Sequence, residues 1–182
     1  MHLDGICGPM YARKTSDLII RAERVRLAGR RALLVKPDLD GRYSSDSLAT
    51  HGGVMIPARV VPATDVGVAE IAAVEGVDWL GVDEVQFFPR SIVGVLLGLV
   101  DAGVRVVWAG LDMDSKGWPF GPVPLLMAVG GVTKLTAVCV ICGDDATHTH
   151  RHSGGSEQVE VGAAEKYSAM CRRCWRAAGG GL

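Results

Sequence analysis

The chain has 182 residues, of which 48% are hydrophobic, and its 19 basic residues nearly balance its 20 acidic ones. Such a length suits one globular domain, or one domain with a small appendage. A net charge of −1 argues against binding to duplex DNA or to an anionic membrane surface. With no run of about 18 apolar residues and no signal-peptide pattern, we expect a cytoplasmic protein that has no membrane or nucleic-acid partner.

The N-terminal segment predicts a strand, a loop and a helix in succession. Leu3–Cys7 is a short, partly apolar run that we expect to be the first strand, although Asp4 and Gly5 have poor strand propensity. From residue 15 to 27 apolar side chains recur at helical spacing, and Gly29 is a plausible stop. A helix that begins directly after a loop is the context that a phosphate-binding loop requires.

The intervening loop nearly matches the phosphate-binding pattern G-x-x-x-x-G-K-[ST]. In that pattern glycines let backbone N–H groups approach the phosphates, Lys reaches the terminal phosphates, and Ser or Thr holds Mg²⁺. Gly8, Lys14 and Thr15 match it, but Arg13 stands at the second glycine. An arginine there must either adopt a conformation that glycine takes freely or displace the loop from the phosphates.

The rest of the first 138 residues alternates between apolar strand patterns and helical patterns. We expect strands at 31–36, where Pro37 ends the strand, and at 54–61, 79–84, 105–111 and 132–138. We expect helices at 65–74, 92–102 and 124–129, and a polar, glycine-rich loop at 38–53. This alternation indicates an α/β domain with a mostly parallel sheet.

The cysteines are one isolated residue, Cys7, and two C-x-x-C pairs, Cys139/Cys142 and Cys171/Cys174. In a reducing compartment such pairs are more typical of metal binding than of disulfides. Four thiolates suit tetrahedral Zn²⁺, and the site would be structural because no position remains for water. The metal would then clamp the base of a loop of 28 residues. The alternative is four unrelated free thiols.

The composition changes at residue 139, after which the chain is polar, glycine-rich and carries histidines. We therefore predict a nucleotide-binding domain at 1–138, a small zinc-binding domain at 139–176 and a flexible tail at 177–182. His148, His150 and His152 alternate, so they would share one face of an extended segment. A second metal site is one interpretation, and surface histidines beside Arg151 are the simpler one.

Two acids, Asp83 and Glu84, end a predicted buried strand, which is where ligands bind in open α/β sheets. An Asp there can hold Mg²⁺, directly or through water, in a P-loop enzyme. A neighbouring Glu can serve as general base toward a hydroxyl acceptor. The alternative is that the two acids merely cap the strand. Asp112, Asp114 and Lys116 follow the next strand and are weaker candidates of the same kind.

Taken together, these residues make the chain resemble the type II thymidine kinases, the family of the human cytosolic and the bacterial enzymes. The matching segments, in order, are Gly8-Pro9-Met10, Asp38-Leu39-Asp40-Gly41-Arg42-Tyr43-Ser44-Ser45, Asp83-Glu84-Val85-Gln86-Phe87-Phe88-Pro89, Gly110-Leu111-Asp112, Pro119-Phe120-Gly121, Lys134-Leu135-Thr136-Ala137-Val138-Cys139, Val161-Gly162 and Tyr167. They extend over nearly the whole chain. The family differs in having glycine at position 13 and a more apolar first strand.

The resemblance implies a P-loop kinase-like domain with a small C-terminal zinc-binding lasso domain, usually in a homotetramer. It also implies transfer of the ATP γ-phosphoryl group to the 5′-hydroxyl of thymidine or deoxyuridine, with ATP, Mg²⁺ and structural Zn²⁺ as cofactors. By position, Glu84 would be the general base, while Thr15 and Asp83 would hold Mg²⁺. The ATP-binding residues would be Gly8, Pro9, Met10, Tyr11, Ala12, Arg13, Lys14, Thr15, Asp40 and Arg42. The nucleoside-binding residues would be Met10, Phe87, Phe120, Thr149, Val159, Val161, Gly162, Ala163 and Tyr167.

Two other functions stay open at this stage. One is a silent relative that binds nucleosides or nucleotides without phosphorylating them, and its only strong support is Arg13. The other is a nucleic-acid binder built on the zinc domain, which the net charge and the sparse aromatic residues disfavour.

Overall fold

The computed structural model describes residues 2–38, 47–49, 55–73, 76–152 and 166–181. A six-stranded sheet forms its centre, with strand order β5-β2-β6-β7-β1-β8, and every neighbouring pair in it is parallel. Its strands are β1 (Leu3–Cys7), β2 (Ala32–Asp38), β5 (Arg59–Pro62), β6 (Trp79–Val82), β7 (Arg105–Gly110) and β8 (Gly131–Lys134). The helices are α1 (Lys14–Leu27), α2 (Asp65–Ala72), α3 (Ile92–Asp101), α4 (Val123–Val129) and a 3₁₀ turn, η1 (Val85–Phe87). The predicted α/β fold with a mostly parallel sheet is thus confirmed.

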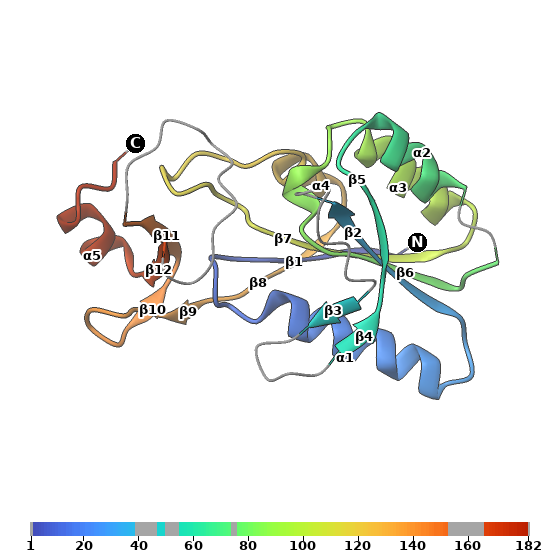
Figure 1. The fold of residues 1–182 in the computed structure, drawn as a ribbon, viewed down its shortest axis with the longest axis horizontal. Coiled ribbons are helices and arrows are strands. Elements are labelled where there is room, and N and C mark those ends of the chain that lie inside the picture. The colour runs from blue at the N-terminus through green and yellow to red at the C-terminus, as the bar shows by residue number, and fades with distance from the viewer. Residues whose placement is uncertain (1, 39–46, 50–54, 74–75, 153–165, 182) are drawn as a thin grey trace.

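Helices cover both faces of this sheet (Figure 1), with α1 on one face and α2, α3 and α4 on the other. Successive strand residues therefore enter different cores: Val106 packs with residues of α3 and α4, and Val107 packs with residues of α1. This is the period-two alternation of a strand that is buried on both sides. It explains why the central strands are almost continuously apolar in sequence.

Gly5 explains how a segment of poor strand propensity comes to lie inside the sheet, between β7 and β8. It lies opposite Trp108 of β7, and a Cβ atom at Gly5 would be 2.0 Å from the buried indole ring. The ring occupies the space that any side chain at this position would need. Tertiary packing therefore overrides the local propensity of β1.

Gly5→Ala should lower the free energy of unfolding by about 1–3 kcal/mol, because the new methyl group overpacks the core against Trp108. Chemical denaturation followed by circular dichroism measures this change. The matched control is Gly98→Ala in α3, where nothing lies within 4 Å of the added Cβ. That substitution should be neutral or stabilising by up to about 1 kcal/mol. Equal destabilisation by both variants would contradict the packing argument.

Four sequence predictions were wrong in detail. Pro37 lies inside β2 instead of ending it, since beyond Val35 the strand has lost β6 and keeps only β5 as a neighbour. The predicted loop at 38–53 contains β3 (Ser47–Ala49), which pairs with β4 (Met55–Pro57). The predicted strand at 54–61 is two strands, β4 and β5, with different partners.

The predicted strand at 132–138 is also two strands, β8 and β9 (Ala137–Val138). The first pairs with β1 in the main sheet, and the second pairs with β10 (Asp145–Ala146). With β11 (His148–Arg151), β12 (Tyr167–Met170) and α5 (Arg172–Ala177), β9 and β10 make up what we call the C-terminal module. Its apolar cluster includes Ala12 from the loop after β1, so the module packs against that loop. Among the described helices, none is long and apolar enough to span a membrane.

Candidate active site and zinc centre

The segment from Gly8 to Thr15 connects β1 to α1 and includes the first two residues of that helix. Three of its residues have a positive φ. Gly8 has φ 143°, and a Cβ there would lie 2.3 Å from the carbonyl oxygen of Leu135. Tyr11 has φ 66°, and Arg13 has φ 61° and ψ 27°, both in the left-handed region. Arg13 thus takes the conformation that glycine adopts freely, at a steric cost of about 1–2 kcal/mol. Its side chain is exposed, and its carbonyl accepts the Asp17 N–H at 3.0 Å to begin α1.

Lys14 folds back beneath this loop. Its side chain is buried, and Nζ donates a hydrogen bond of 2.7 Å to the carbonyl oxygen of Pro9. Burial lowers the pKa of Lys14, while the carboxylates of Glu84, Asp83 and Asp112 oppose this effect. The ammonium group of Lys14 lies at the start of a helix and at the carboxyl end of a parallel sheet, which is where α/β proteins bind anions.

Thr15 and Asp83 join the loop to the end of β6. Thr15 Oγ1 donates a hydrogen bond of 2.8 Å to Asp83 Oδ2. The other carboxylate oxygen, Asp83 Oδ1, is buried and has no hydrogen-bond partner among the described residues. Burial, and then the charge of Glu84, raises the pKa of Asp83 to about 7. A hydroxyl and a carboxylate oxygen without a partner are hard oxygen ligands, so these residues fit Mg²⁺.

Glu84 follows Asp83 in a left-handed conformation, with φ 50°, and begins η1. Its Oε2 accepts a hydrogen bond from Gln86 Nε2. Phe87, one residue further on, meets Phe120 edge to face, with ring centroids 5.6 Å apart. The turn after β6 therefore carries the two acids and Phe87, which contacts Phe120 from the loop before α4.

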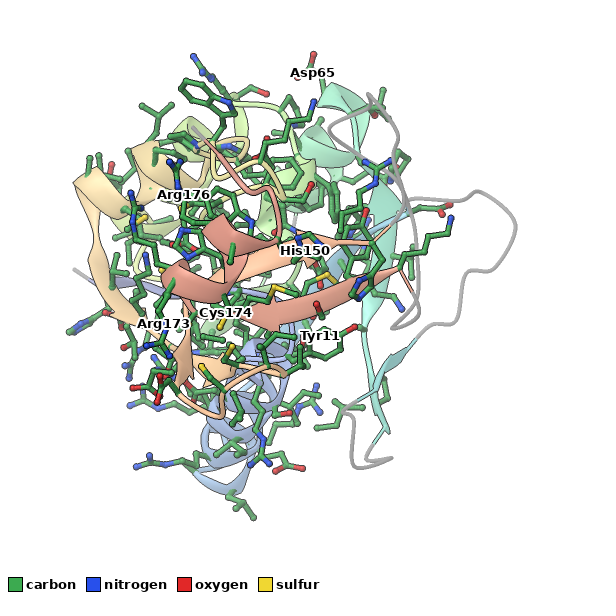
Figure 2. The ribbon with its side chains drawn as sticks, turned by 90° about the vertical axis from the view of Figure 1, so that its left-hand side faces the viewer. Tyr11, Asp65, His150, Arg173, Cys174 and Arg176 are labelled. Atoms are coloured by element: carbon green, nitrogen blue, oxygen red, sulfur yellow. The ribbon has the colours of Figure 1, made fainter. Side chains whose placement is uncertain are left out.

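The C-terminal module contacts the loop through two hydrogen bonds. The backbone N–H of Met10 donates to Thr149 Oγ1 at 3.1 Å, and Tyr11 Oη donates to the carbonyl oxygen of Tyr167 at 3.0 Å. Figure 2 shows Tyr11 beside the strands of the module. Trp175 Nε1 of α5 adds a third link from the module to the rest of the chain, by donating to the carbonyl oxygen of Ser115 at 3.3 Å. The fold thus brings together predicted site residues that are more than 130 positions apart, as the sequence separation of 139 between Met10 and Thr149 shows.

Six predicted site residues lie outside the described residues: Asp40, Arg42, Val159, Val161, Gly162 and Ala163. Of the weaker candidates, Asp114 accepts the backbone N–H groups of Lys116 and Trp118, at 2.9 Å each, and so holds its own turn. Asp112 is buried and pairs with Lys134 at 2.6 Å.

Sequence reasoning missed Gln86 and Lys134 as members of this region. Gln86 lies in a segment that matches the family, and the resemblance implies no role for it. A polar residue between the apolar Val85 and Phe87 was the one available signal for it. Lys134 ends its strand on the same edge of the sheet as the acids, and only the strand order reveals that it reaches across β1 to Asp112.

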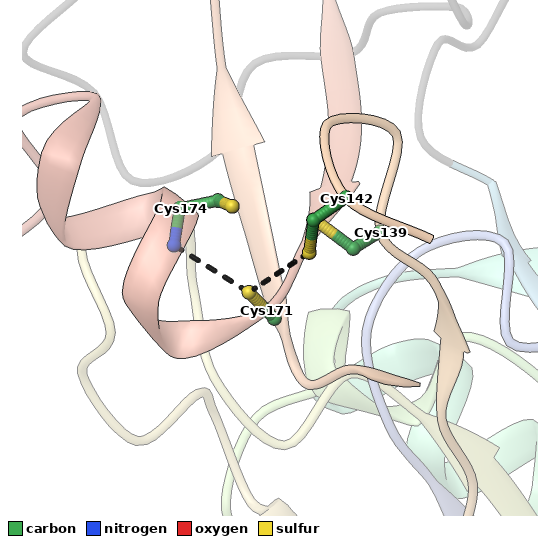
Figure 3. A group of neighbouring side chains, drawn as sticks. All are labelled: Cys139, Cys142, Cys171 and Cys174. Carbon is green, nitrogen blue, oxygen red and sulfur yellow. Dashed lines mark hydrogen bonds between the residues drawn. The ribbon is translucent and has the colours of Figure 1, made fainter. Parts of the chain in front are cut away.

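The four paired cysteines converge at the base of the C-terminal module (Figure 3), and their sulfur atoms all lie within 4.8 Å of one another. Cys142 Sγ and Cys171 Sγ are 3.7 Å apart. Tetrahedral zinc with Zn–S bonds of about 2.3 Å places its sulfurs about 3.8 Å apart. The donor set and spacing therefore fit a structural Zn²⁺, and among the described residues no other three or more His, Cys, Asp and Glu side chains gather their ligand atoms in this way.

Local hydrogen bonds set the protonation of these thiols. Backbone N–H groups, first that of Cys171, lower the pKa of Cys139 to about 6. Hydrogen bonds among the thiols, first with Cys171, raise the pKa of Cys174 to about 12. A metal bound by four thiolates would displace the remaining protons, so its affinity falls in acid.

The alternating histidines are held by packing. His148 is buried, and its ring lies on the indole of Trp175 with centroids 4.5 Å apart. Burial and then the charge of Arg172 lower the pKa of His148, which favours the neutral ring. His150 and His152 meet edge to face at 5.4 Å. The described residues thus give no support to a second metal site, and His148 is a core residue where a surface histidine was expected.

Comparison with known proteins decides the family. The family model described as thymidine kinase matches residues 1–175. The thymidine kinase of Deinococcus radiodurans is 43% identical over 98% of this chain and 92% of its own. That of Thermococcus kodakarensis is 44% identical over 93% of this chain and 91% of its own. The chain belongs to the thymidine kinase family. A third member, the thymidine kinase of Bacteroides thetaiotaomicron, is 38% identical over 98% of this chain and 88% of its own.

Among solved structures, a DNA replication initiation factor aligns with a TM-score of 0.47 at 14% identity, over 74% of this chain and 40% of that chain. A similarity this low bears on neither fold nor function. The α/β architecture of this family member follows from its own sheet order, and the cysteine cluster that can bind zinc follows from its own sulfur positions.

Proposed function

We propose that this family member is an active ATP-dependent thymidine kinase that phosphorylates the 5′-hydroxyl of thymidine or deoxyuridine. The observation that carries the proposal is the hydrogen bond between Thr15 and Asp83, which joins a glycine-led loop to an acid pair at the carboxyl edge of the sheet. Phosphoryl transfer depends mainly on positioning and charge neutralisation, and this arrangement supplies groups for both.

The loop would bind ATP through the backbone of residues 8–15, with the Lys14 ammonium on the terminal phosphates in place of the Pro9 carbonyl. Thr15 and Asp83 would hold Mg²⁺, which when bound neutralises charge on the transferred phosphate. Asp40 and Arg42, which match a family loop near the phosphates, belong to the same proposal. These residues orient the γ-phosphoryl group toward the acids that follow β6.

Glu84 would accept the proton of the 5′-hydroxyl as that oxygen bonds to the γ-phosphorus. The bond between the γ-phosphorus and its bridging oxygen then breaks, and ADP leaves. Met10, Phe87, Phe120, Thr149 and Tyr167 would surround the nucleoside, together with residues 159, 161, 162 and 163 of the lasso. The edge-to-face pair of Phe87 and Phe120 gives this pocket an aromatic wall.

The division into a kinase domain (1–138), a zinc-binding lasso domain (139–176) and a tail (177–182) remains a proposal, as do a cytoplasmic location and a homotetramer. Size-exclusion chromatography with light scattering tests the last of these. A monomer at micromolar concentration would overturn it.

The decisive experiment is an assay for thymidine monophosphate, made from thymidine and Mg-ATP by the purified protein. Product formation that requires both substrates supports the proposal. Calorimetry with thymidine and with Mg-ATP distinguishes an active kinase from a silent relative. A protein that binds thymidine but neither binds ATP nor forms product would favour the silent relative. Running the assay in parallel with thymidine and deoxyuridine establishes which nucleoside is preferred.

Arg13→Gly should leave kcat within about threefold of the wild type, because Arg13 already adopts the glycine conformation. It should raise the free energy of unfolding by up to about 1 kcal/mol, since steric relief of about 1–2 kcal/mol exceeds the extra unfolded-state entropy of glycine. Steady-state kinetics and thermal unfolding measure the two effects. An inactive wild type with activity restored in Arg13→Gly would overturn the proposal of an active enzyme.

Arg13→Ala is the matched control for this position, because it removes the charge and keeps the strained backbone. A rise in KM for ATP shared by both variants reports the lost charge. A gain in stability confined to Arg13→Gly reports the backbone.

A further inference from the structure

Gln86 is a buried polar residue with both ends of its amide engaged. Only 2% of its surface is exposed, and it lies in η1, between the acid pair and the aromatic wall. Its Oε1 accepts the backbone N–H of Leu111 at 2.9 Å, and its Nε2 donates to Glu84 Oε2. One side chain therefore links the turn after β6 to the end of β7.

The orientation of this amide is fixed by its partners. A glutamine amide carries an oxygen that only accepts hydrogen bonds and an NH₂ group that only donates them. Here the backbone N–H of Leu111 is solely a donor, so the amide oxygen must face it. The NH₂ group then faces the carboxylate of Glu84, which is an acceptor when ionised.

Two glycines close the packing around Gln86. A Cβ atom at Gly110 would lie 2.6 Å from Gln86 Oε1, so the end of β7 approaches the amide closely. Gly121, with φ 54°, brings the loop before α4 equally close, because a Cβ there would lie 2.2 Å from the carbonyl oxygen of Gln86. Both the side chain and the backbone of Gln86 are therefore closely packed by neighbouring backbone.

We propose that Gln86 is the positioning residue for Glu84, holding Oε2 by a hydrogen bond so that Oε1 faces the acceptor hydroxyl. The inference rests on the proposed role of Glu84 as general base. A carboxylate can rotate about its last side-chain bond, and a fixed donor on one oxygen removes that freedom before substrate binds. Pre-organisation of this kind lowers the barrier of the chemical step without adding a contact to the substrate.

The test uses two variants of similar shape. Gln86→Met removes both polar ends. Gln86→Glu keeps an acceptor for Leu111 and places a carboxylate against Glu84 instead of a donor. Both should lower kcat by about 10- to 100-fold, with the KM for thymidine and for ATP changed less than about threefold, since positioning acts on the reacting geometry. Thermal unfolding confirms that each variant is folded, and Gln86→Glu remains informative if Gln86→Met is not.

A double-mutant cycle separates positioning from a merely structural role. In a Glu84→Gln background, Gln86→Met should have almost no further effect on kcat, because the group that it positions is already gone. An undiminished further loss there, or an unchanged kcat in Gln86→Glu alone, would overturn the inference. Full activity of Glu84→Gln by itself would instead overturn the assignment of Glu84 as base, so the two failures are distinguishable.

Discussion

Glu84→Gln should lower kcat by about 10²- to 10⁴-fold, the usual contribution of a positioned general base. The substitution keeps the shape of the side chain and removes its ability to take the proton of the 5′-hydroxyl. Because the loop proposed to bind ATP is not altered, the KM for ATP should stay close to that of the wild type. Steady-state kinetics with each substrate varied in turn measures both parameters.

The matched control for Glu84→Gln is Glu70→Gln, the same chemical change on the surface of α2. Glu70 makes an exposed ion pair with Arg59 at 3.7 Å, and such pairs contribute little. Its kcat should therefore equal that of the wild type. If Glu84→Gln matched this control, proton removal would have to be assigned to another group.

Loss of the metal is the second large effect. We expect about one tightly held Zn²⁺ per chain, and Cys171→Ser should release it and unfold the C-terminal module before the parallel sheet. Structural zinc contributes an apparent free energy of about 10–16 kcal/mol to small zinc-finger peptides, so the module should not stay folded without it. Metal analysis of fresh protein and hydrogen exchange at residues 137–152 and 166–177 test this expectation.

Cys7→Ser is the control for the metal experiment, since Cys7 is buried at the end of β1 and is not part of the cysteine cluster. It should leave the zinc content unchanged. Less than half an equivalent of zinc in the wild type, or normal protection of the module in Cys171→Ser, would contradict a structural metal. Loss of zinc should also weaken nucleoside binding, because Thr149 and Tyr167, which we propose to contact the nucleoside, lie on strands of the module.

Much of the fold follows from local sequence. Buried strands that alternate with amphipathic helices predicted the α/β domain, and the C-x-x-C spacing predicted the cysteine cluster. What local sequence could not show was pairing between distant segments. Pro37 is tolerated because β6 has already ended beside it, and the segments 54–61 and 132–138 divide because their halves pair with different strands.

Part of the candidate site likewise follows from local sequence, and part depends on contacts between distant segments. Sequence patterns identified the candidates Lys14, Thr15, Asp83 and Glu84. A P-loop-like segment and a buried strand that ends in two acids can both be recognised without a structure. The left-handed conformation of Arg13 was one of two outcomes that the sequence allowed, and local sequence does not choose between them. The contact of Met10 with Thr149 depends on how the module docks, which no local pattern encodes.

The hydrogen bonds that join Met10 and Tyr11 to the C-terminal module have a thermodynamic consequence. Met10 and Tyr11 belong to the segment proposed for ATP, whereas Thr149 and Tyr167 belong to strands proposed for the nucleoside. A ligand that shifts one segment therefore changes the free energy of the other. Linkage requires this coupling to be reciprocal, so any factor by which ATP alters thymidine affinity is the factor by which thymidine alters ATP affinity.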